Sequence, residues 1–287
     1  MKTFGLIGNP LSHSHSQNYF TNKFLQENIC DAEYQLFPLK NIEEIAALLK
    51  HPTLLGFNVT IPYKSAIIPF LDEIDTVAQD IGAVNCVVKE NGRWIGYNTD
   101  VVGFEKTICD IRLSDYPMCD MRQSYNHQST IENQMITHFI SEAGNRKSDN
   151  RMSQISNLKS HISNLVLGSG GAAKSVGYVL KQKNIPFQIV SLKKTDKTIM
   201  YNEVTAELVR QTTLIINTTP LGMFPNIDKK PTIPYSALHS NHILIDLIYN
   251  PEETLFLKEG KKRGAVIING LTMFEAQAEA SYLKFKI

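Results

Sequence analysis

Short apolar runs alternate with longer stretches of mixed character over the first part of the chain. The runs at 4–7, 33–37 and 55–59 have the length and composition of buried β-strands, and turn-forming residues bound them. The stretches at 17–28 and 42–50 are predicted to be helices. Because strands alternate with helices, this part of the chain predicts an α/β fold with a mainly parallel sheet.

A β-hairpin is expected to complete this first unit. The dipeptide Asn91-Gly92 is a strong signal for a tight hairpin turn, and runs at 83–88 and 94–97 flank it as strands. A short helix is expected around 67–71, between the third strand and the hairpin.

A second α/β unit is expected from residue 164 onward, with the strand–helix alternation of a Rossmann-like domain. Its predicted strands are 165–167, 187–191, 214–217, 243–247 and 265–269, and its predicted first helix is 172–183. A final helix at 272–283 is expected to return to the first unit.

The stretch from about 110 to 163 separates the two units and is rich in Ser, Asn, Gln and charge. It holds a brief seven-residue near repeat, too short to indicate a coiled coil, so we interpret it as a polar insertion that adds no chemistry. The chain is therefore expected to form a first domain from 1–103 completed by 271–287, and a second domain from 104–270 that includes the insertion.

Composition and charge exclude several classes of protein. Hydrophobic residues make up 43% of the chain and charged residues 20%, as in ordinary globular proteins. Lys plus Arg number 29 and Asp plus Glu 28, so no global charge favours nucleic acid or a membrane surface. The four cysteines and the scattered histidines show no metal-ligand spacing, and no signal-peptide pattern precedes the first strand. We expect a cytoplasmic protein without a metal site.

A glycine turn opens the second unit and indicates a dinucleotide site. Gly168, Gly170 and Ala173 fit G-x-G-x-x-A directly after a predicted strand and at the start of a helix. The first glycine permits the tight turn, the second lets a pyrophosphate approach the backbone, and the helix N-terminus favours the anion. The strand–turn–helix context favours nucleotide binding over a purely structural turn.

The end of the next strand bears on which dinucleotide binds. An NAD site usually has Asp or Glu there, but this chain reads Ser191-Leu192-Lys193-Lys194. The lysines could pair with a 2′-phosphate, which favours NADP. The alternative is an ordinary solvated lysine pair.

Polar residues also gather at the predicted strand ends of the first unit. Ser14 and Ser16 lie two apart, so in an extended loop they point the same way, toward a carboxylate or polyol; equally, they could cap the following helix. Thr60 and Lys64 follow the third strand, where Pro62 breaks it.

Asn85 and Asp100 add to these clusters, although a helix-capping role is the alternative for Asp100. A lysine and a carboxylate in one crevice can move a proton and hold a hydroxylated substrate, so we expect Lys64 and Asp100 to form a catalytic pair.

Eight segments, in order along nearly the whole chain outside the insertion, resemble those of the shikimate dehydrogenase family. In the first unit they are Asn9-Pro10-Leu11-Ser12-His13-Ser14-His15-Ser16, Asn58-Val59-Thr60-Ile61-Pro62-Tyr63-Lys64, Gly82-Ala83-Val84-Asn85 and Asn98-Thr99-Asp100. In the second they are Gly168-Ser169-Gly170-Gly171-Ala172, Asn217-Thr218-Thr219-Pro220-Leu221-Gly222-Met223, Asp246-Leu247-Ile248-Tyr249-Asn250-Pro251 and Gly270-Leu271-Thr272-Met273-Phe274-Glu275-Ala276-Gln277.

The resemblance implies reversible NADP-dependent reduction of 3-dehydroshikimate to shikimate, in the pathway to chorismate and aromatic amino acids. It implies Lys64 and Asp100 as the catalytic pair, with Lys64 the proton carrier. The implied substrate-binding residues are Ser14 and Ser16, on the carboxylate, with Thr60, Asn85, Tyr249 and Gln277. The implied cofactor-binding residues are Gly168, Ser169, Gly170, Gly171, Ala172, Leu247 and Gly270. Ser191, Lys193 and Lys194, at the end of the next predicted strand, are further cofactor-binding candidates from the sequence itself.

The chain departs from the family pattern in two places. The family commonly carries Asn-Arg-Thr where this chain has Ser191-Leu192-Lys193, and lysine does not reproduce the planar clamp and stacking surface of arginine. The insertion is the second departure.

Two alternative functions are a quinate/shikimate dehydrogenase that uses NAD or NADP, and a non-catalytic shikimate-binding module. The absent carboxylate and the paired serines argue against the first, and the presence of both Lys64 and Asp100 argues against the second. We expect a small-molecule substrate, no nucleic-acid or membrane partner, and a monomer or homodimer.

Overall fold

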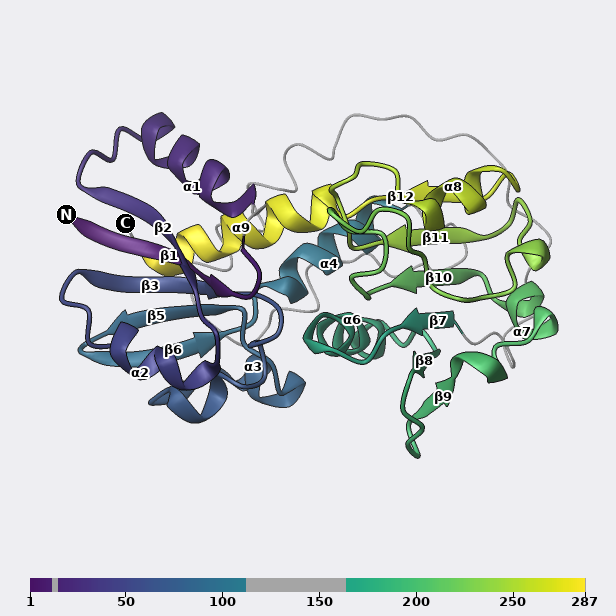
Figure 1. Ribbon diagram of the computed structural model, residues 1–287, viewed down its shortest axis with the longest axis horizontal. Helices are drawn as coiled ribbons and strands as arrows, with labels where there is room; N and C mark the ends of the chain where they lie inside the picture. Colours follow the sequence, from purple (N-terminus) through teal and green to yellow (C-terminus); the bar gives the residue numbers. More distant parts are fainter. Residues whose placement is uncertain (12–14, 112–163, 287) are drawn as a thin grey trace.

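Two six-stranded sheets organise the molecule, one in each of two lobes that lie side by side (Figure 1). The computed structural model describes residues 1–11, 15–111 and 164–286. The strands of the first lobe are β1 (Lys2–Gly8), β2 (Ala32–Pro38), β3 (Leu54–Val59), β4 (Glu73–Ile74), β5 (Cys86–Glu90) and β6 (Arg93–Tyr97). Their order is β2-β1-β3-β5-β6-β4, and β5 runs opposite to both of its neighbours. The expected mainly parallel sheet is confirmed.

Short helical segments connect these strands. They are α1 (His15–Gln26), η1 (Ile42–Glu44), α2 (Ile45–Leu48), η2 (Ile68–Phe70) and α3 (Thr76–Ile81). The helix predicted at 42–50 is thus a 3₁₀ turn followed by one α-helical turn, and the helix predicted around 67–71 is a 3₁₀ turn that contains a proline. The predicted hairpin is confirmed, with Asn91 at φ 50° and Gly92 at φ 80°, as a type I′ turn requires.

The second lobe has an entirely parallel sheet. Its strands are β7 (Asn164–Leu167), β8 (Phe187–Ser191), β9 (Thr198–Met200), β10 (Leu214–Asn217), β11 (Ile243–Asp246) and β12 (Val266–Ile268). Its helical segments are α6 (Gly171–Gln182), η3 (Tyr201–Glu203), α7 (Ala206–Gln211), η4 (Tyr235–Ala237) and α8 (Leu255–Lys261). The strand order β12-β11-β10-β7-β8-β9 is that of the Rossmann dinucleotide-binding fold, and the order reverses between β7 and β10.

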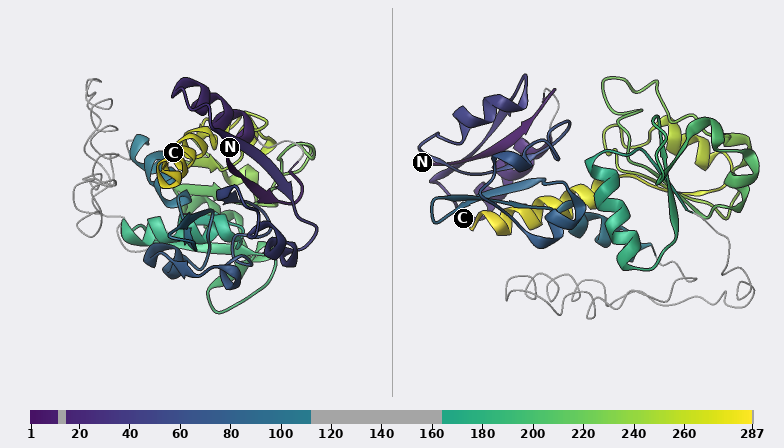
Figure 2. Two further views of the ribbon diagram at one scale, coloured as in Figure 1. Left: turned by 90° about the vertical axis from the view of Figure 1, so that its left-hand side faces the viewer. Right: turned by 90° about the horizontal axis from the view of Figure 1, so that it is seen from below.

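Two helices run between the lobes: α4 (Asp100–Asp110) leaves the first lobe, and α9 (Leu271–Phe285) returns to it (Figure 2). They approach so closely that a Cβ at Gly103 would lie 2.4 Å from the carbonyl oxygen of Met273. Phe285, at the far end of α9, packs in one core with Phe4 and Phe20 of the first lobe. The boundary expected at residue 103 therefore falls inside α4.

Hydrophobic cores cover both faces of each sheet. Along β1, Phe4 and Leu6 face the core shared with α1 and α9, while Ile7 faces the core on the other side. Along β7, Leu165 and Val166 likewise point into different cores. This period of two is the expected alternation of a strand buried on both faces.

Among the described residues, no helix combines the length and the apolar character needed to cross a membrane.

Candidate active site

The polar residues of the first lobe meet at one edge of its sheet. The order of the sheet reverses between β1 and β3, and ligands of open α/β sheets bind outside the carboxyl ends of strands at such a point. Thr60 and Lys64 follow β3, and Asp100 follows β6. Asn85 reaches the same edge because β5, which it precedes, runs in the opposite direction.

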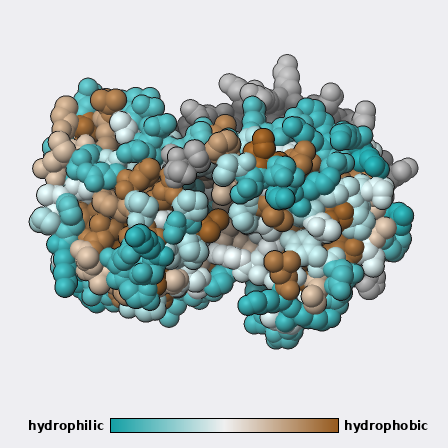
Figure 3. All heavy atoms as spheres, viewed as in Figure 1, coloured by the Kyte–Doolittle hydropathy of each residue, from teal (hydrophilic) through white to brown (hydrophobic). Residues whose placement is uncertain are grey.

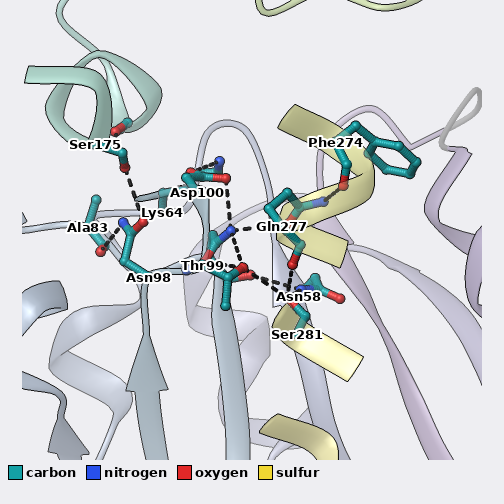
Figure 4. A network of polar contacts seen from close by, with 12 residues as sticks. Asn58, Lys64, Ala83, Asn98, Thr99, Asp100, Ser175, Phe274, Gln277 and Ser281 are labelled. Atoms are coloured by element: carbon teal, nitrogen blue, oxygen red, sulfur yellow. Dashed lines mark hydrogen bonds and ion pairs between the residues drawn. The ribbon is translucent and has the colours of Figure 1, made fainter. Parts of the chain in front are cut away.

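Lys64 and Asp100 are in direct contact. Lys64 Nζ donates to Asp100 Oδ2 over 2.6 Å, and the side chains are only 16% and 6% exposed (Figure 4). A short, charge-assisted bond between two shielded groups fixes both side chains. The sequence pattern is thus right in bringing this pair together.

Asp100 does not cap its own helix. Thr99 occupies the N-cap position of α4 and makes no side-chain cap, while Asp100 is the first helical residue. The second carboxylate oxygen of Asp100 accepts from Asn85 Nδ2 over 2.8 Å. The capping alternative is therefore wrong, because both oxygens point to side chains of the site.

Asn85 connects the pair to two further elements. Its Oδ1 accepts from the backbone N–H of Thr99 over 2.6 Å, and its Nδ2 lies 3.3 Å from Gln277 Oε1 on α9. The Gln277 amide nitrogen in turn donates to the carbonyl oxygen of Phe274 over 3.1 Å. Four of the predicted site residues, Lys64, Asn85, Asp100 and Gln277, therefore form one network.

A second layer of polar residues supports this network from behind. Ser281 Oγ lies 2.9 Å from Thr99 Oγ1, and it accepts from Asn58 Nδ2 over 2.8 Å. The hydroxyl of Tyr34 donates to Asn58 Oδ1 over 2.8 Å. Sequence reasoning did not include Ser281, although its position four residues after Gln277 on a helix was a usable signal.

The remaining predicted substrate-binding residues come from other segments of the chain. Ser14 lies outside the described residues, and Ser16 is the second residue of α1. Thr60 is half-buried at the end of β3, where a Cβ at Gly8 would meet its methyl group at 2.4 Å. Within the described part of the chain, no hydrogen bond joins Thr60 to Lys64 or Asp100.

Tyr249 comes from the second lobe and meets the first. Its ring lies edge-on to His15 at 5.3 Å between centroids, and 4.6 Å from the ring of Phe274. Burial raises the pKa of Tyr249 to about 12, so its hydroxyl stays protonated at neutral pH and can donate a hydrogen bond.

The glycine turn after β7 has the features that a bound pyrophosphate requires. Gly168 has a φ of 112°, and a Cβ there would lie 2.6 Å from Thr218 Oγ1. A Cβ at Gly170 would meet no atom within 4 Å, so this backbone is open to a ligand. Gly170 is also the N-cap of α6 and offers no side-chain acceptor to the first N–H groups of that helix. These groups suit a phosphate anion, and the predicted dinucleotide turn fits.

The end of β8 is more complicated than its sequence suggests. Leu192 is 83% exposed, and Lys193 is also exposed. Lys194 forms an ion pair with Glu203, whose pKa this lysine lowers through their hydrogen bond. Sequence reasoning missed Glu203, because the carboxylate does not follow β8 but comes from η3, after the neighbouring strand.

Leu247 and Gly270 lie against each other. A Cβ at Gly270 would lie 2.1 Å from the carbonyl oxygen of Leu247, and the Gly270 N–H donates to the Ile248 carbonyl over 3.0 Å. Only glycine permits this approach. The loop after β11 and the start of α9 are thereby held together.

The glycine turn and the lysine–carboxylate pair are neighbours across the two lobes. A Cβ at Gly171 would lie 2.9 Å from Cβ of Lys64. Lys174 Nζ donates to Ser65 Oγ and to the Gly82 carbonyl, both over 2.9 Å. In the space-filling view the surface is notched between the two lobes (Figure 3).

No group of three or more potential metal-ligating side chains occurs among the described residues.

The candidate active site combines two parts. A Rossmann-type lobe carries the glycine turn, and this turn lies against the lysine–carboxylate pair of the other α/β lobe. This combination defines a two-domain, dinucleotide-dependent oxidoreductase.

Comparison with known proteins identifies the family. Residues 6–87 match the family model described as the shikimate dehydrogenase substrate binding domain. A shikimate dehydrogenase (NADP(+)) from Methanococcus maripaludis is 32% identical over 298 residues, covering 98% of this chain and 90% of the relative. The enzyme of that name from Bacillus cereus is 33% identical, and the match covers 97% of this chain and 90% of the relative. The chain belongs to the shikimate dehydrogenase family.

Solved structures agree with this assignment. A crystal structure of shikimate dehydrogenase in complex with NADP+ is 30% identical in sequence, has a TM-score of 0.68, and covers 99% of this chain and 90% of its own. The crystal structure of shikimate dehydrogenase 1 from Peptoclostridium difficile is 29% identical in sequence and has a TM-score of 0.72. The match covers 100% of this chain and 92% of that chain. The predicted fold class is confirmed.

Proposed function

We propose that the protein catalyses the reversible NADPH-dependent reduction of 3-dehydroshikimate to shikimate, a step toward chorismate and the aromatic amino acids. The observation that carries this proposal is the shielded Lys64–Asp100 pair, whose lysine packs directly against the glycine turn at Gly171. If the glycine turn binds the dinucleotide as proposed, that contact would put a proton donor next to the cofactor, as reduction of a ketone requires.

Lys64 would act on the substrate oxygen. Bound NADPH would supply the hydride to the carbonyl carbon. As negative charge grows on the carbonyl oxygen, the Lys64 ammonium stabilises it and then transfers a proton from Nζ to it. Asp100 holds Nζ in place through the 2.6 Å bond, and Asn85 holds Asp100 in turn. In the oxidative direction a neutral Lys64 accepts the hydroxyl proton.

The polar groups around this pair suit a polyhydroxylated acid. Asn85 and Gln277 carry amide groups, and Thr60 and Tyr249 carry hydroxyls, so together they can both donate to and accept from several ring hydroxyls. Ser14 and Ser16 would bind the carboxylate of the substrate. In this proposal residues 1–103 with 271–287 form the substrate-binding and catalytic domain.

Residues 104–270 would form the NADP-binding domain. Residues Gly168, Ser169, Gly170, Gly171 and Ala172 would hold the pyrophosphate. Ser191, Lys193 and Lys194 would lie near the 2′-phosphate, and Leu247 and Gly270 near the nicotinamide. We further propose a cytoplasmic monomer or homodimer that binds no nucleic acid, since the net charge of the chain is only +1.

The decisive experiment measures turnover of shikimate through the absorbance of the reduced nicotinamide, with NADP+ and with NAD+. We expect turnover with NADP+, and Lys64→Met should lower kcat by on the order of a hundredfold or more with little change in the KM for shikimate. Lys181→Met, at an exposed position on α6, is the matched control and should behave like the wild type.

Two results would contradict the proposal. An unchanged kcat in Lys64→Met would remove this lysine from the chemistry. Binding of shikimate without turnover by either dinucleotide would instead identify a non-catalytic shikimate-binding module.

One observation favours a second candidate, a quinate/shikimate dehydrogenase that also uses NAD. Lys194 is already paired with Glu203, which leaves it less available to a 2′-phosphate. Comparable turnover with NAD+, or turnover of quinate, would support this candidate.

A further inference from the structure

A fixed carboxylate lies beside the region where a Rossmann fold receives the adenosine ribose. Strands β8 and β9 are paired in parallel, with Ser191 opposite Met200. Lys194 comes three residues after Ser191, and Glu203 comes three residues after Met200. The two side chains therefore lie at the same edge of the sheet. Ser191 Oγ lies 3.0 Å from Ser169 Oγ, which joins this edge to the glycine turn.

Glu203 is held in place independently of its ion pair. One carboxylate oxygen accepts from the backbone N–H of Met200 over 2.8 Å, which forms part of a capping box at the start of η3. The other oxygen accepts from Lys194 Nζ. The carboxylate is therefore the anchored partner, and the lysine is the side chain drawn toward it.

The two lysines of this loop consequently differ. The backbone N–H of Lys193 donates to Ser191 Oγ over 3.2 Å, and within the described residues its ammonium forms no ion pair. Lys194 is occupied by Glu203. A bound 2′-phosphate would meet one available ammonium and one nearby carboxylate.

We propose that Glu203 is a determinant of dinucleotide selectivity: it withholds Lys194 from the ribose 2′ position and opposes a 2′-phosphate there. The proposal rests on the proposed function, because it assumes that the adenosine ribose lies at the carboxyl end of β8. It predicts that the ratio of NADP affinity to NAD affinity is smaller in this protein than it would be if both lysines lacked a neighbouring carboxylate.

The effect should be moderate. A phosphate monoester carries between one and two negative charges at neutral pH, so its repulsion by a carboxylate several ångströms away is appreciable. Lys194 and Glu203 are 60% and 37% exposed, however, and salt screens exposed charges. Removal of the Glu203 charge should therefore tighten NADP+ binding by about three- to tenfold at low salt, and less at high salt.

The test is a titration of the full chain, by calorimetry and without substrate. It compares NADP+ with NAD+, and adenosine 2′,5′-bisphosphate with adenosine 5′-monophosphate, because the two members of each pair differ only in the 2′-phosphate. Glu203→Gln keeps an oxygen for the Met200 N–H but removes the charge. Glu207→Gln, at an exposed position on α7, removes one charge from the same lobe and serves as the control.

Glu203→Gln should tighten NADP+ and the bisphosphate, and should change the Kd of NAD+ and the monophosphate by less than about twofold. Lys194→Met should weaken NADP+ binding more in the Glu203→Gln background than in the wild type, because only there is the ammonium released. Lys193→Met should weaken it in both backgrounds.

Unchanged Kd ratios in Glu203→Gln would overturn the inference and leave the proposed function standing. An equal gain for NADP+ in Glu207→Gln would also overturn it, because the effect would then be one of net charge. A wild-type protein that binds neither dinucleotide would refute both the inference and the proposed function.

Discussion

Replacement of Asp246 by asparagine tests how one buried carboxylate makes the unfolding free energy depend on pH. Asp246 ends β11, and its side chain is fully buried. It accepts hydrogen bonds from Asn217 Nδ2 over 3.0 Å, the Ile248 N–H over 3.1 Å and Thr254 Oγ1 over 2.6 Å. These donors favour the ionised form, but burial outweighs them and raises the pKa of Asp246 to about 6.

A raised pKa in the folded state makes stability fall as pH rises. The folded protein binds the Asp246 proton more tightly than the unfolded chain, in which an aspartate has a pKa of about 3.9. The resulting stabilisation is complete below that unfolded value and is lost as pH rises through about 6. A difference of roughly two pKa units corresponds to about 3 kcal/mol in total, of which about 2 kcal/mol should be lost between pH 4 and pH 8.

The assay is urea unfolding of the wild type and Asp246→Asn at several pH values across that range. Circular dichroism should follow it, because the single tryptophan, Trp94, lies in the first lobe. Subtracting the unfolding free energies of the two proteins removes the contributions of the titrating groups that they share. As pH rises, the wild type should lose about 2 kcal/mol of stability relative to the variant. A flat difference, or a shift toward the wild type, would refute the reasoning. Asp228→Asn, at an exposed carboxylate, should show no such trend.

Substitutions at two further positions test contacts between helices and between lobes. Glu105→Gln should lower the unfolding free energy by about 3 kcal/mol. In the wild type the Lys183 ammonium lies 2.7 Å from the Glu105 carboxylate, and the variant leaves this ammonium buried without its charged partner. An unchanged urea midpoint would contradict this prediction. Lys174→Met should lower kcat severalfold with a small change in melting temperature, because the bonds to Ser65 and Gly82 hold the backbone next to Lys64. Lys174→Arg should restore most of the rate, and equal rates in all three proteins would exclude a positioning role.

Much of the fold could be predicted because the central strands are buried and therefore mostly apolar. The runs at β7 and β10 contain only buried residues, and the Asn91-Gly92 turn requires positive φ at both positions. The site residues Lys64 and Asp100 could be predicted because each follows a strand, and Asn85 reaches the same edge because it precedes the antiparallel strand β5. An open α/β sheet brings such ends together without any further information.

Helix α4 was not predicted from the sequence, and polar residues occupy part of its buried surface. It packs between α6 and α9, so polar Glu105 and Thr107 are buried beside apolar Phe104 and Ile108. A buried surface that is only partly apolar gives a weaker hydrophobic pattern than that of a typical surface helix. Sequence reasoning gave Asp100 as a site residue with helix capping as the alternative, and it predicted no helix at 100–110.

The pairing of Lys194 with Glu203 was also beyond the sequence pattern. The rule for NAD sites looks for a carboxylate at the end of the second strand, which here is β8. Glu203 instead follows β9, and only the parallel register of Ser191 with Met200 brings it to Lys194. Local patterns do not contain this register, since it is set by how the sheet assembles.

The return of α9 to the first lobe has a consequence for how the protein is made. Phe4 and Phe20 emerge early from the ribosome, but the core they belong to also contains Ala278 and Phe285. Ser281, on the same helix, completes the hydrogen bonds behind the candidate active site. The first lobe therefore cannot finish folding during synthesis until the whole Rossmann lobe has been translated. A catalytically competent site should form only after residue 285 is released, so incomplete chains should be inactive.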